Sequence, residues 1–141
     1  MGKLAVVYWS GSGNTEEMAG YVFEGAKSGG ADVELYTADA FPVEELENMS
    51  GIAFGCPSMG DEELEEAEFQ PMFDACRPML KDKPIGLFGS FGWGDGAWMR
   101  TWEQECRALG ADLVHPGVIC KEAPDAAAAA ACRSLGKSLA Q

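Results

Sequence analysis

The sequence contains few basic residues and a single histidine. Ten Lys and Arg stand against 23 Asp and Glu, so the formal net charge is −13. Proteins hold the nucleic-acid backbone through basic side chains, and an anionic membrane surface repels a protein of this charge, so we expect neither as a partner. A metal site or a Ser–His or Cys–His catalytic pair would have to be built around His115 alone, directly before Pro116. We therefore predict no metal site and no catalytic residue.

The cysteines lack the spacing of a metal or disulfide site, and long apolar runs are missing as well. Five cysteines, an odd number, are scattered without a C-x-x-C pair, which argues against a disulfide framework and against a zinc or iron–sulfur site. No stretch approaches the roughly 18 apolar residues of a membrane span. The N-terminal apolar run of six residues is too short for a signal peptide. These absences predict a cytoplasmic protein with free thiols.

The chain instead shows strand and helix patterns in alternation. Apolar runs typical of strands cover residues 4–9, 32–36, 52–56, 85–90 and 113–119, the last with an irregularity at Pro116. Helix signals cover residues 18–26, 71–80 (opened by Pro71), 97–110 and an alanine-rich segment capped by Asp125. This order predicts one α/β domain, residues 1–141, with a doubly wound parallel sheet and helices on both faces. Such sheets bind ligands at the carboxyl ends of their strands.

The first loop at that edge, residues 10–15, joins a buried strand to a helix N-terminus. Free N–H groups and the helix dipole favour an anion there. The loop has no Gly-Lys-Ser or Gly-Lys-Thr of a phosphate-binding Walker motif, and Glu16 stands where a dinucleotide fingerprint needs its third glycine. Its hydroxyl-rich, lysine-free composition suits one terminal phosphate held by neutral donors. The structural alternative is a turn followed by an ordinary helix N-cap.

The second and third loops, residues 57–62 and 90–96, are rich in glycine and carry one large side chain each, Met59 and Trp93. Such loops let the backbone approach a flat ligand while the large side chains cover its faces. The alternative is that Met59 and Trp93 pack in the core or contact a partner. Six acids in residues 61–68 adjoin the second loop, and a solvated surface is the ordinary interpretation of such a run.

Together the three loops resemble those of the flavodoxins, specifically the short-chain flavodoxins of anaerobic bacteria, over essentially the whole chain. The resemblance rests on Trp9-Ser10-Gly11-Ser12-Gly13-Asn14-Thr15-Glu16, Met59-Gly60-Asp61-Glu62-Glu63-Leu64-Glu65 and Gly89-Ser90-Phe91-Gly92-Trp93-Gly94-Asp95-Gly96-Ala97-Trp98-Met99. Phe91 departs mildly from the family pattern, in which tyrosine is frequent. The resemblance implies a five-stranded sheet of order 2-1-3-4-5 and an FMN-binding, low-potential one-electron carrier rather than an enzyme.

The resemblance also implies where FMN would bind. The phosphate would lie on the first loop, Met59 and Trp93 would flank the isoalloxazine, the backbone of residues 90–92 would face the pyrimidine edge, and Glu62 and Glu63 would add contacts near the ring. The implied cofactor-binding residues are Ser10, Gly11, Ser12, Gly13, Asn14, Thr15, Pro57, Ser58, Met59, Gly60, Asp61, Glu62, Glu63, Ser90, Phe91, Gly92, Trp93, Gly94 and Asp95.

Physical reasoning connects these loops to electron transfer. A flip of the Gly60–Asp61 peptide would offer a carbonyl to flavin N5–H in the neutral semiquinone, and glycine permits the turn at little cost. The acidic run would disfavour the anionic hydroquinone and so lower that potential. The same acids would attract redox partners with basic docking faces, such as flavin or iron–sulfur reductases and oxidoreductases. We expect the carrier to be a monomer.

Three other functions fit the sequence less well. An FMN-dependent NAD(P)H:quinone or azo reductase shares the fold, but it needs open space above the flavin and often a basic residue for the nucleotide. A signalling receiver domain needs an acidic pair after the first strand, where this chain has Ser10-Gly11. A domain separated from a larger flavoprotein, or a maturation-type protein without flavin, fits the complete loops less well.

Overall fold

A sheet of parallel strands runs through the centre of the molecule. The computed structural model describes residues 3–141, and in them the strands are β1 (Lys3–Tyr8), β2 (Asp32–Thr37), β3 (Met49–Gly55), β4 (Pro84–Phe91), β5 (Asp112–Leu113) and β6 (Val118–Lys121). Their order is β2-β1-β3-β4-β5, and β6 also pairs with β4. Every strand pair is parallel. The predicted order 2-1-3-4-5 is confirmed.

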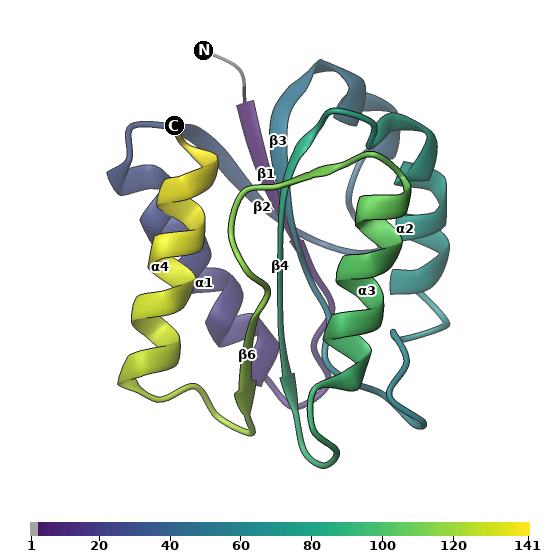
Figure 1. Ribbon diagram of the computed structural model, residues 1–141. Helices are drawn as coiled ribbons and strands as arrows, with labels where there is room; N and C mark the ends of the chain where they lie inside the picture. The colour runs from purple at the N-terminus through teal and green to yellow at the C-terminus, as the bar shows by residue number, and fades with distance from the viewer. Residues whose placement is uncertain (1–2) are drawn as a thin grey trace.

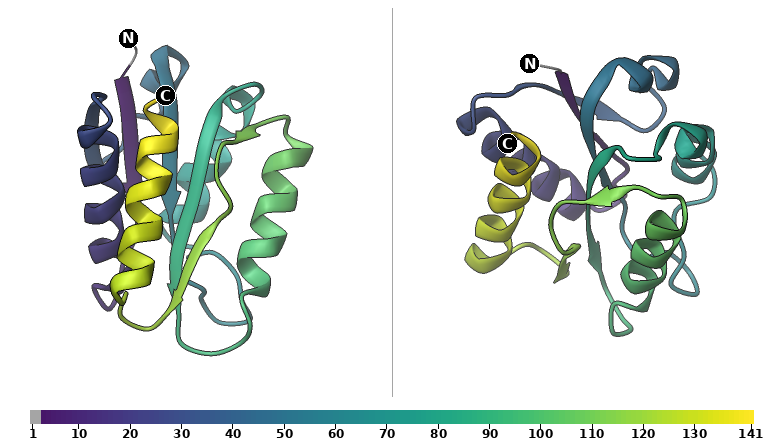
Figure 2. Two further views of the ribbon diagram at one scale, coloured as in Figure 1. Left: turned by 60° about the vertical axis from the view of Figure 1, so that its left-hand side comes forward. Right: turned by 45° about the horizontal axis from the view of Figure 1, so that its top comes forward.

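Helices cover both faces of this sheet, as predicted (Figures 1 and 2). Helices α1 (Asn14–Ser28) and α4 (Ala126–Leu139) lie on one face, and α2 (Phe69–Cys76) and α3 (Ala97–Ala108) lie on the other. Two core clusters result, one on each side. Alternate residues of β1 enter different clusters: Leu4 and Val6 pack toward α1 and α4, whereas Ala5 and Val7 pack toward α2 and α3. Burial on both faces explains why this strand is continuously apolar.

The edge of the sheet differs from the prediction of one strand over residues 113–119. Two short strands, β5 and β6, pair with successive parts of β4; the N–H of Val114 still donates to Ile85 O at 3.1 Å, and residues 115–117 leave the ladder. Pro116 has no N–H to donate to a ladder, which breaks the pairing there. The N–H of Gly117 donates instead to Glu103 Oε2 in α3 at 2.8 Å. The predicted irregularity is thus confirmed, and the continuous strand is wrong.

Helix α2 also differs from the prediction that Pro71 opens it and Leu80 ends it. The helix begins two residues earlier, at Phe69, so Pro71 is its third residue, where the missing N–H has no helical acceptor to lose. The α-helix ends at Cys76, and a 3-10 turn, η2 (Arg77–Met79), follows with Pro78 inside it. A second 3-10 helix, η1 (Val43–Asn48), was not predicted. Within residues 3–141 no helix is both long and apolar enough to span a bilayer.

Candidate functional site

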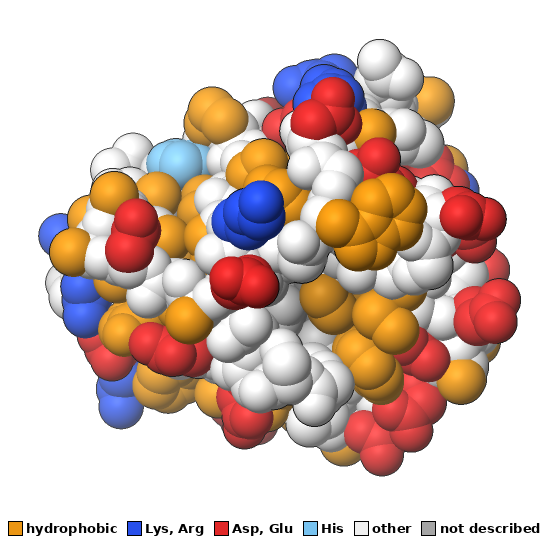
Figure 3. Space-filling model, turned by 90° about the horizontal axis from the view of Figure 1, so that it is seen from below, with side chains coloured by type: hydrophobic (Ala, Val, Ile, Leu, Met, Phe, Trp, Pro, Cys, Tyr) orange, Lys and Arg blue, Asp and Glu red, His pale blue; other side chains and the backbone are white. Residues whose placement is uncertain are grey.

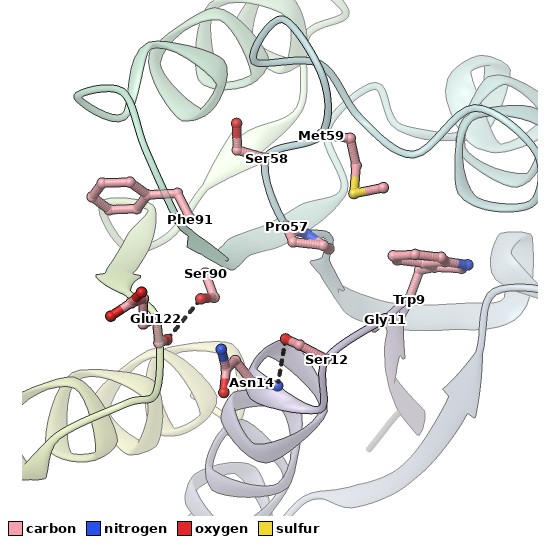
Figure 4. Close-up of a pocket in the computed structure, with 11 residues that line it drawn as sticks. Trp9, Gly11, Ser12, Asn14, Pro57, Ser58, Met59, Ser90, Phe91 and Glu122 are labelled. Atoms are coloured by element: carbon pink, nitrogen blue, oxygen red, sulfur yellow. Dashed lines mark hydrogen bonds between the residues drawn. The ribbon is translucent and has the colours of Figure 1, made fainter.

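A cleft of about 340 Å³ opens at the carboxyl ends of β1, β3 and β4. Figure 4 shows Ser12 and Asn14 at its floor, Met59 and Trp9 on one side, and Phe91 and Glu122 on the other. The cleft is lined by Trp9, Gly11, Ser12, Asn14, Pro57, Ser58, Met59, Ser90, Phe91, Gly92 and Glu122. All three predicted loops therefore meet at one site, and none of its lining residues is basic.

The first loop turns into helix α1 at Gly13, whose φ of 98° lies in the left-handed region that favours glycine. The Ser10 hydroxyl accepts the N–H of Gly13 at 3.1 Å, and the Ser12 hydroxyl accepts that of Asn14 at 3.5 Å. Each hydroxyl then still has its own hydrogen to donate. The first backbone bond across this helix start runs from Glu17 N to Gly13 O at 3.0 Å, so the N–H groups of Thr15 and Glu16 remain for other acceptors.

Two hydroxyls join the first loop to β4, and β4 to the residue that follows β6. Thr15 is buried, and its Oγ1 accepts the N–H of Ser90 at 3.3 Å. Ser90 Oγ in turn donates to the carbonyl of Glu122 at 2.7 Å. Thr15 thus holds the floor of the cleft to its wall rather than lining the cleft itself. Ser10 faces a smaller neighbouring pocket, which Tyr8, Trp9 and Glu16 also line.

The second loop contains a tight hairpin, which we define as the 59–63 hairpin. Met59 and Glu63 exchange two backbone hydrogen bonds, both 2.8 Å long. Gly60 and Glu62 inside it have φ values of 47° and 57°. The N–H of Ser58 bonds to Ser90 O at 3.0 Å, which fastens the entrance of the hairpin to β4. Met59 lines the cleft, while Gly60 and Asp61 at the tip are exposed.

The third loop places its tryptophan outside the cleft. Trp93 is 58% exposed and is not among the lining residues, unlike its neighbours Phe91 and Gly92. Phe91 packs against Trp98 with ring centroids 5.5 Å apart. Asp95 does not line the cleft either, and it pairs with Arg100 at 3.1 Å. A large exposed indole at the rim of a cleft is a surface that a bound flat ligand can cover.

Acidic side chains surround this end of the molecule. Figure 3, which views it from the carboxyl ends of the strands, shows acidic groups flanking exposed hydrophobic ones. The acids do not all act as free charges, however. Glu62 Oε1 accepts the N–H of Ala97 at 2.9 Å, at the start of α3, and so joins the second loop to the third. Asp61, Glu63 and Glu66 are exposed.

Sequence reasoning missed two residues of the cleft, Trp9 and Glu122. The Trp9 ring lies against Gly11, where an added Cβ would stand 3.1 Å from the indole, and its Nε1 donates to Glu68 at 3.0 Å. Trp9 could have been found, because it directly precedes the first loop at the end of a strand. Glu122 has a left-handed φ of 59° after the irregular strand pair, and no sequence motif marks it.

None of the cysteines lines the cleft. All five cysteines are free, and four of them are buried. Burial raises the pKa of Cys56, which precedes the second loop, to about 12, so this thiol stays protonated and unreactive near neutral pH. Among residues 3–141, no three His, Cys, Asp or Glu side chains gather where they could hold a metal ion.

Comparisons with known proteins agree with the geometry. The family model for flavodoxin matches residues 6–136. A flavodoxin of Megasphaera elsdenii is 42% identical over 138 residues, 98% of either chain, and one of Clostridium beijerinckii is 39% identical over 97% of this chain and 99% of its own. The solution structure of two-electron reduced Megasphaera elsdenii flavodoxin matches with a TM-score of 0.86, covering 97% of this chain and 98% of that one. The chain therefore belongs to the flavodoxin family and is a low-potential carrier of single electrons between redox partners on bound FMN.

Proposed function

We propose that the cleft between the three loops is the FMN site of this chain, and that residues 1–141 act as one monomeric, cytoplasmic domain that turns over no substrate of its own. The proposal rests on one observation, which is that the same cleft has both a site for an anion and apolar walls. A lysine-free helix N-terminus with free hydroxyl donors forms its floor, and Met59, Trp9 and Phe91 form apolar walls.

The floor fits a phosphate group. Ser12, which lines the cleft, accepts a backbone N–H group and keeps its own hydrogen, so it can donate to an anion more strongly. Gly13 has no atom within 4 Å of an added Cβ, so the turn stands open to a ligand. No lysine or arginine contributes, and the phosphate would be held by neutral donors and the helix dipole.

The walls fit a flat ring. Met59 stands on one side of the cleft, and the exposed Trp93 is close enough in sequence to the lining residues Phe91 and Gly92 to cover the other side. The backbone of residues 90–92 would contact the polar edge of the ring. Bound FMN supplies one-electron chemistry, while the chain's own contribution is to exclude water and position hydrogen-bonding groups.

A carbonyl of the 59–63 hairpin would accept a hydrogen bond from the proton at flavin N5. Gly60 has φ 47°, and an added Cβ there would meet nothing within 4 Å, so its peptide has room to turn. We assign the Gly60 carbonyl the role of accepting a hydrogen bond from N5–H. The exposed acids Asp61 and Glu63 would keep added negative charge unfavourable and attract partners with basic docking faces.

A charge placed in the floor tests the site. Ser12→Glu puts a carboxylate where the phosphate would bind, whereas Ser134→Glu adds the same charge on the exposed surface of α4. We expect Ser12→Glu to raise the Kd for FMN at least about tenfold through charge repulsion, and Ser134→Glu to leave it within twofold. Riboflavin, which lacks the phosphate, should bind the wild type and both variants equally well. Equal FMN affinity in the two variants would contradict the proposed phosphate site.

A further inference from the structure

One acid of the run at residues 61–68 is not a surface charge. Glu65 is only 7% exposed, whereas Glu66 beside it is exposed. Burying a carboxylate costs free energy unless hydrogen bonds compensate it. Burial by itself raises the pKa of Glu65, but hydrogen bonds from the backbone of Phe69, Glu68 and Ala67 outweigh it and lower the pKa overall. Glu65 is therefore charged and held in place at neutral pH.

Hydrogen bonds explain this burial. Glu65 Oε1 accepts the N–H groups of Glu68 and Phe69, and Oε2 accepts that of Ala67, each at 2.8 Å. The carbonyl of Glu65 accepts the N–H of Gln70, also at 2.8 Å. Pro71 comes next and has no N–H. The donors that a helix start normally leaves without acceptors are thus satisfied by Glu65 alone.

Glu65 also connects this helix start to the sheet. Its own N–H donates to the buried Sγ of Cys56 at 3.3 Å, at the end of β3. The second loop leaves the sheet at Cys56, forms the 59–63 hairpin and returns to the same point at Glu65. Ser58 attaches the entrance of that hairpin to β4, and Glu62 after its tip binds the start of α3. Glu65 is the corresponding attachment at its exit.

We propose that Glu65 is the positioning residue of the 59–63 hairpin, which it holds against the FMN cleft through hydrogen bonds rather than through its charge. This inference rests on the proposed function, because it concerns the same cleft. Without the Glu65 carboxylate, the start of α2 would fray, and the hairpin would sample several positions relative to Met59 and the cleft. Both the affinity for FMN and the two one-electron potentials depend on that position.

Two isosteric variants separate position from charge. Glu65→Gln and Glu66→Gln each remove one negative charge from neighbouring places in the same run, but only Glu65 holds backbone N–H groups. We expect Glu65→Gln to raise the Kd for FMN about fivefold, the effect of losing a helix cap, and Glu66→Gln to leave it within twofold. Both midpoint potentials should shift further in Glu65→Gln than in Glu66→Gln, and amide exchange at residues 67–69 should quicken only in Glu65→Gln.

If Glu65 had a merely structural role, Glu65→Gln would be less stable toward urea, but its midpoint potentials would equal those of Glu66→Gln. Equal potentials and equal Kd values in the two Gln variants would therefore overturn the inference. Glu65→Asp serves if Glu65→Gln does not fold, since it keeps the charge but draws the carboxylate back by one methylene. A raised Kd in Glu65→Asp would support the inference, and wild-type behaviour would overturn it. If the wild-type protein itself takes up no FMN, the proposed function fails. If the wild type binds FMN but the two Gln variants behave alike, only the inference about Glu65 fails.

Discussion

Gly60 decides whether the hairpin can turn its peptide toward the cleft. Its φ of 47° lies in the left-handed region, and space around it is free, so an alanine there would meet conformational strain and no clash. That strain costs about 1 kcal/mol and resists a peptide flip. We predict that Gly60→Ala narrows the gap between the two one-electron midpoint potentials of the bound flavin.

Gly30 provides the matched control for this change. Its φ of 92° is also left-handed and its surroundings are also open, but it lies after α1, far along the chain from the three loops. Gly30→Ala should lower stability by a similar amount and leave both potentials unchanged. A spectroscopic redox titration of the two variants decides the matter, and an unaltered gap in Gly60→Ala would count against the proposed carbonyl.

Several site residues could be identified from residue types alone, and others could not. Glycines in three loops after strands indicated where the cleft forms, because parallel strands bring those loops to one edge. The positions of the acids could not be predicted. Glu62, Glu63 and Glu65 have the same chemistry in sequence, yet one binds the start of α3, one is exposed and one binds the start of α2. Only tertiary contacts distinguish them.

Helices α1 and α4 touch through glycine. A Cβ added to Gly136 would lie 2.1 Å from the carbonyl oxygen of Val22 and 2.6 Å from the N of Ala26, both backbone atoms that cannot yield locally. We predict that Gly136→Ala destabilises the protein by about 2–3 kcal/mol in urea unfolding, as overpacking of a tight core does. Gly20→Ala, in α1 with open space around it, should instead stabilise by roughly 0.5–1 kcal/mol. Equal effects in the two variants would refute direct helix contact.

The start of α2 should respond to acid. The folded-state pKa of Glu65 is lowered from 4.5, so this carboxylate stabilises the fold above that value and loses its contribution as pH falls below it. We predict that the difference in unfolding free energy between wild type and Glu65→Gln is constant near neutral pH and shrinks as pH falls from about 5 toward 3. Urea unfolding across that range measures it. A difference that grows in acid would contradict the hydrogen-bonded role of the carboxylate.

The kinds of element were easier to predict than their ends. Alternation of apolar runs and helical spacing indicated the doubly wound sheet, since each pattern reflects burial on a whole face. The split between β5 and β6 and the early start of α2 depend on single contacts instead. Gly117 binds Glu103 across the sheet edge, and Phe69 binds Glu65 in the preceding loop. Propensity does not reveal such partners.

Because of the net charge of the whole molecule, added salt should change the rate of FMN binding and the rate of reaction with a basic partner in opposite directions. A net charge of −13 repels the FMN phosphate and attracts a basic protein. Added salt screens both fields. We predict that raising the ionic strength from about 0.02 to 0.2 M speeds FMN uptake by the apoprotein and slows electron transfer to a basic redox partner. Stopped-flow measurements follow both rates, and a common direction would contradict the proposed electrostatics.

The central claim is that this chain carries electrons singly on FMN and does not itself oxidise a nicotinamide. Stepwise dithionite titration of the purified protein, followed by its absorption spectrum with NAD(P)H added to a parallel sample, tests it most directly. We predict flavin bands close to those of FMN, reduction in two separate one-electron steps, and no direct oxidation of NAD(P)H. A single two-electron step with rapid reduction by NAD(P)H would identify a reductase instead, and a protein that neither contains nor takes up FMN would contradict the account entirely.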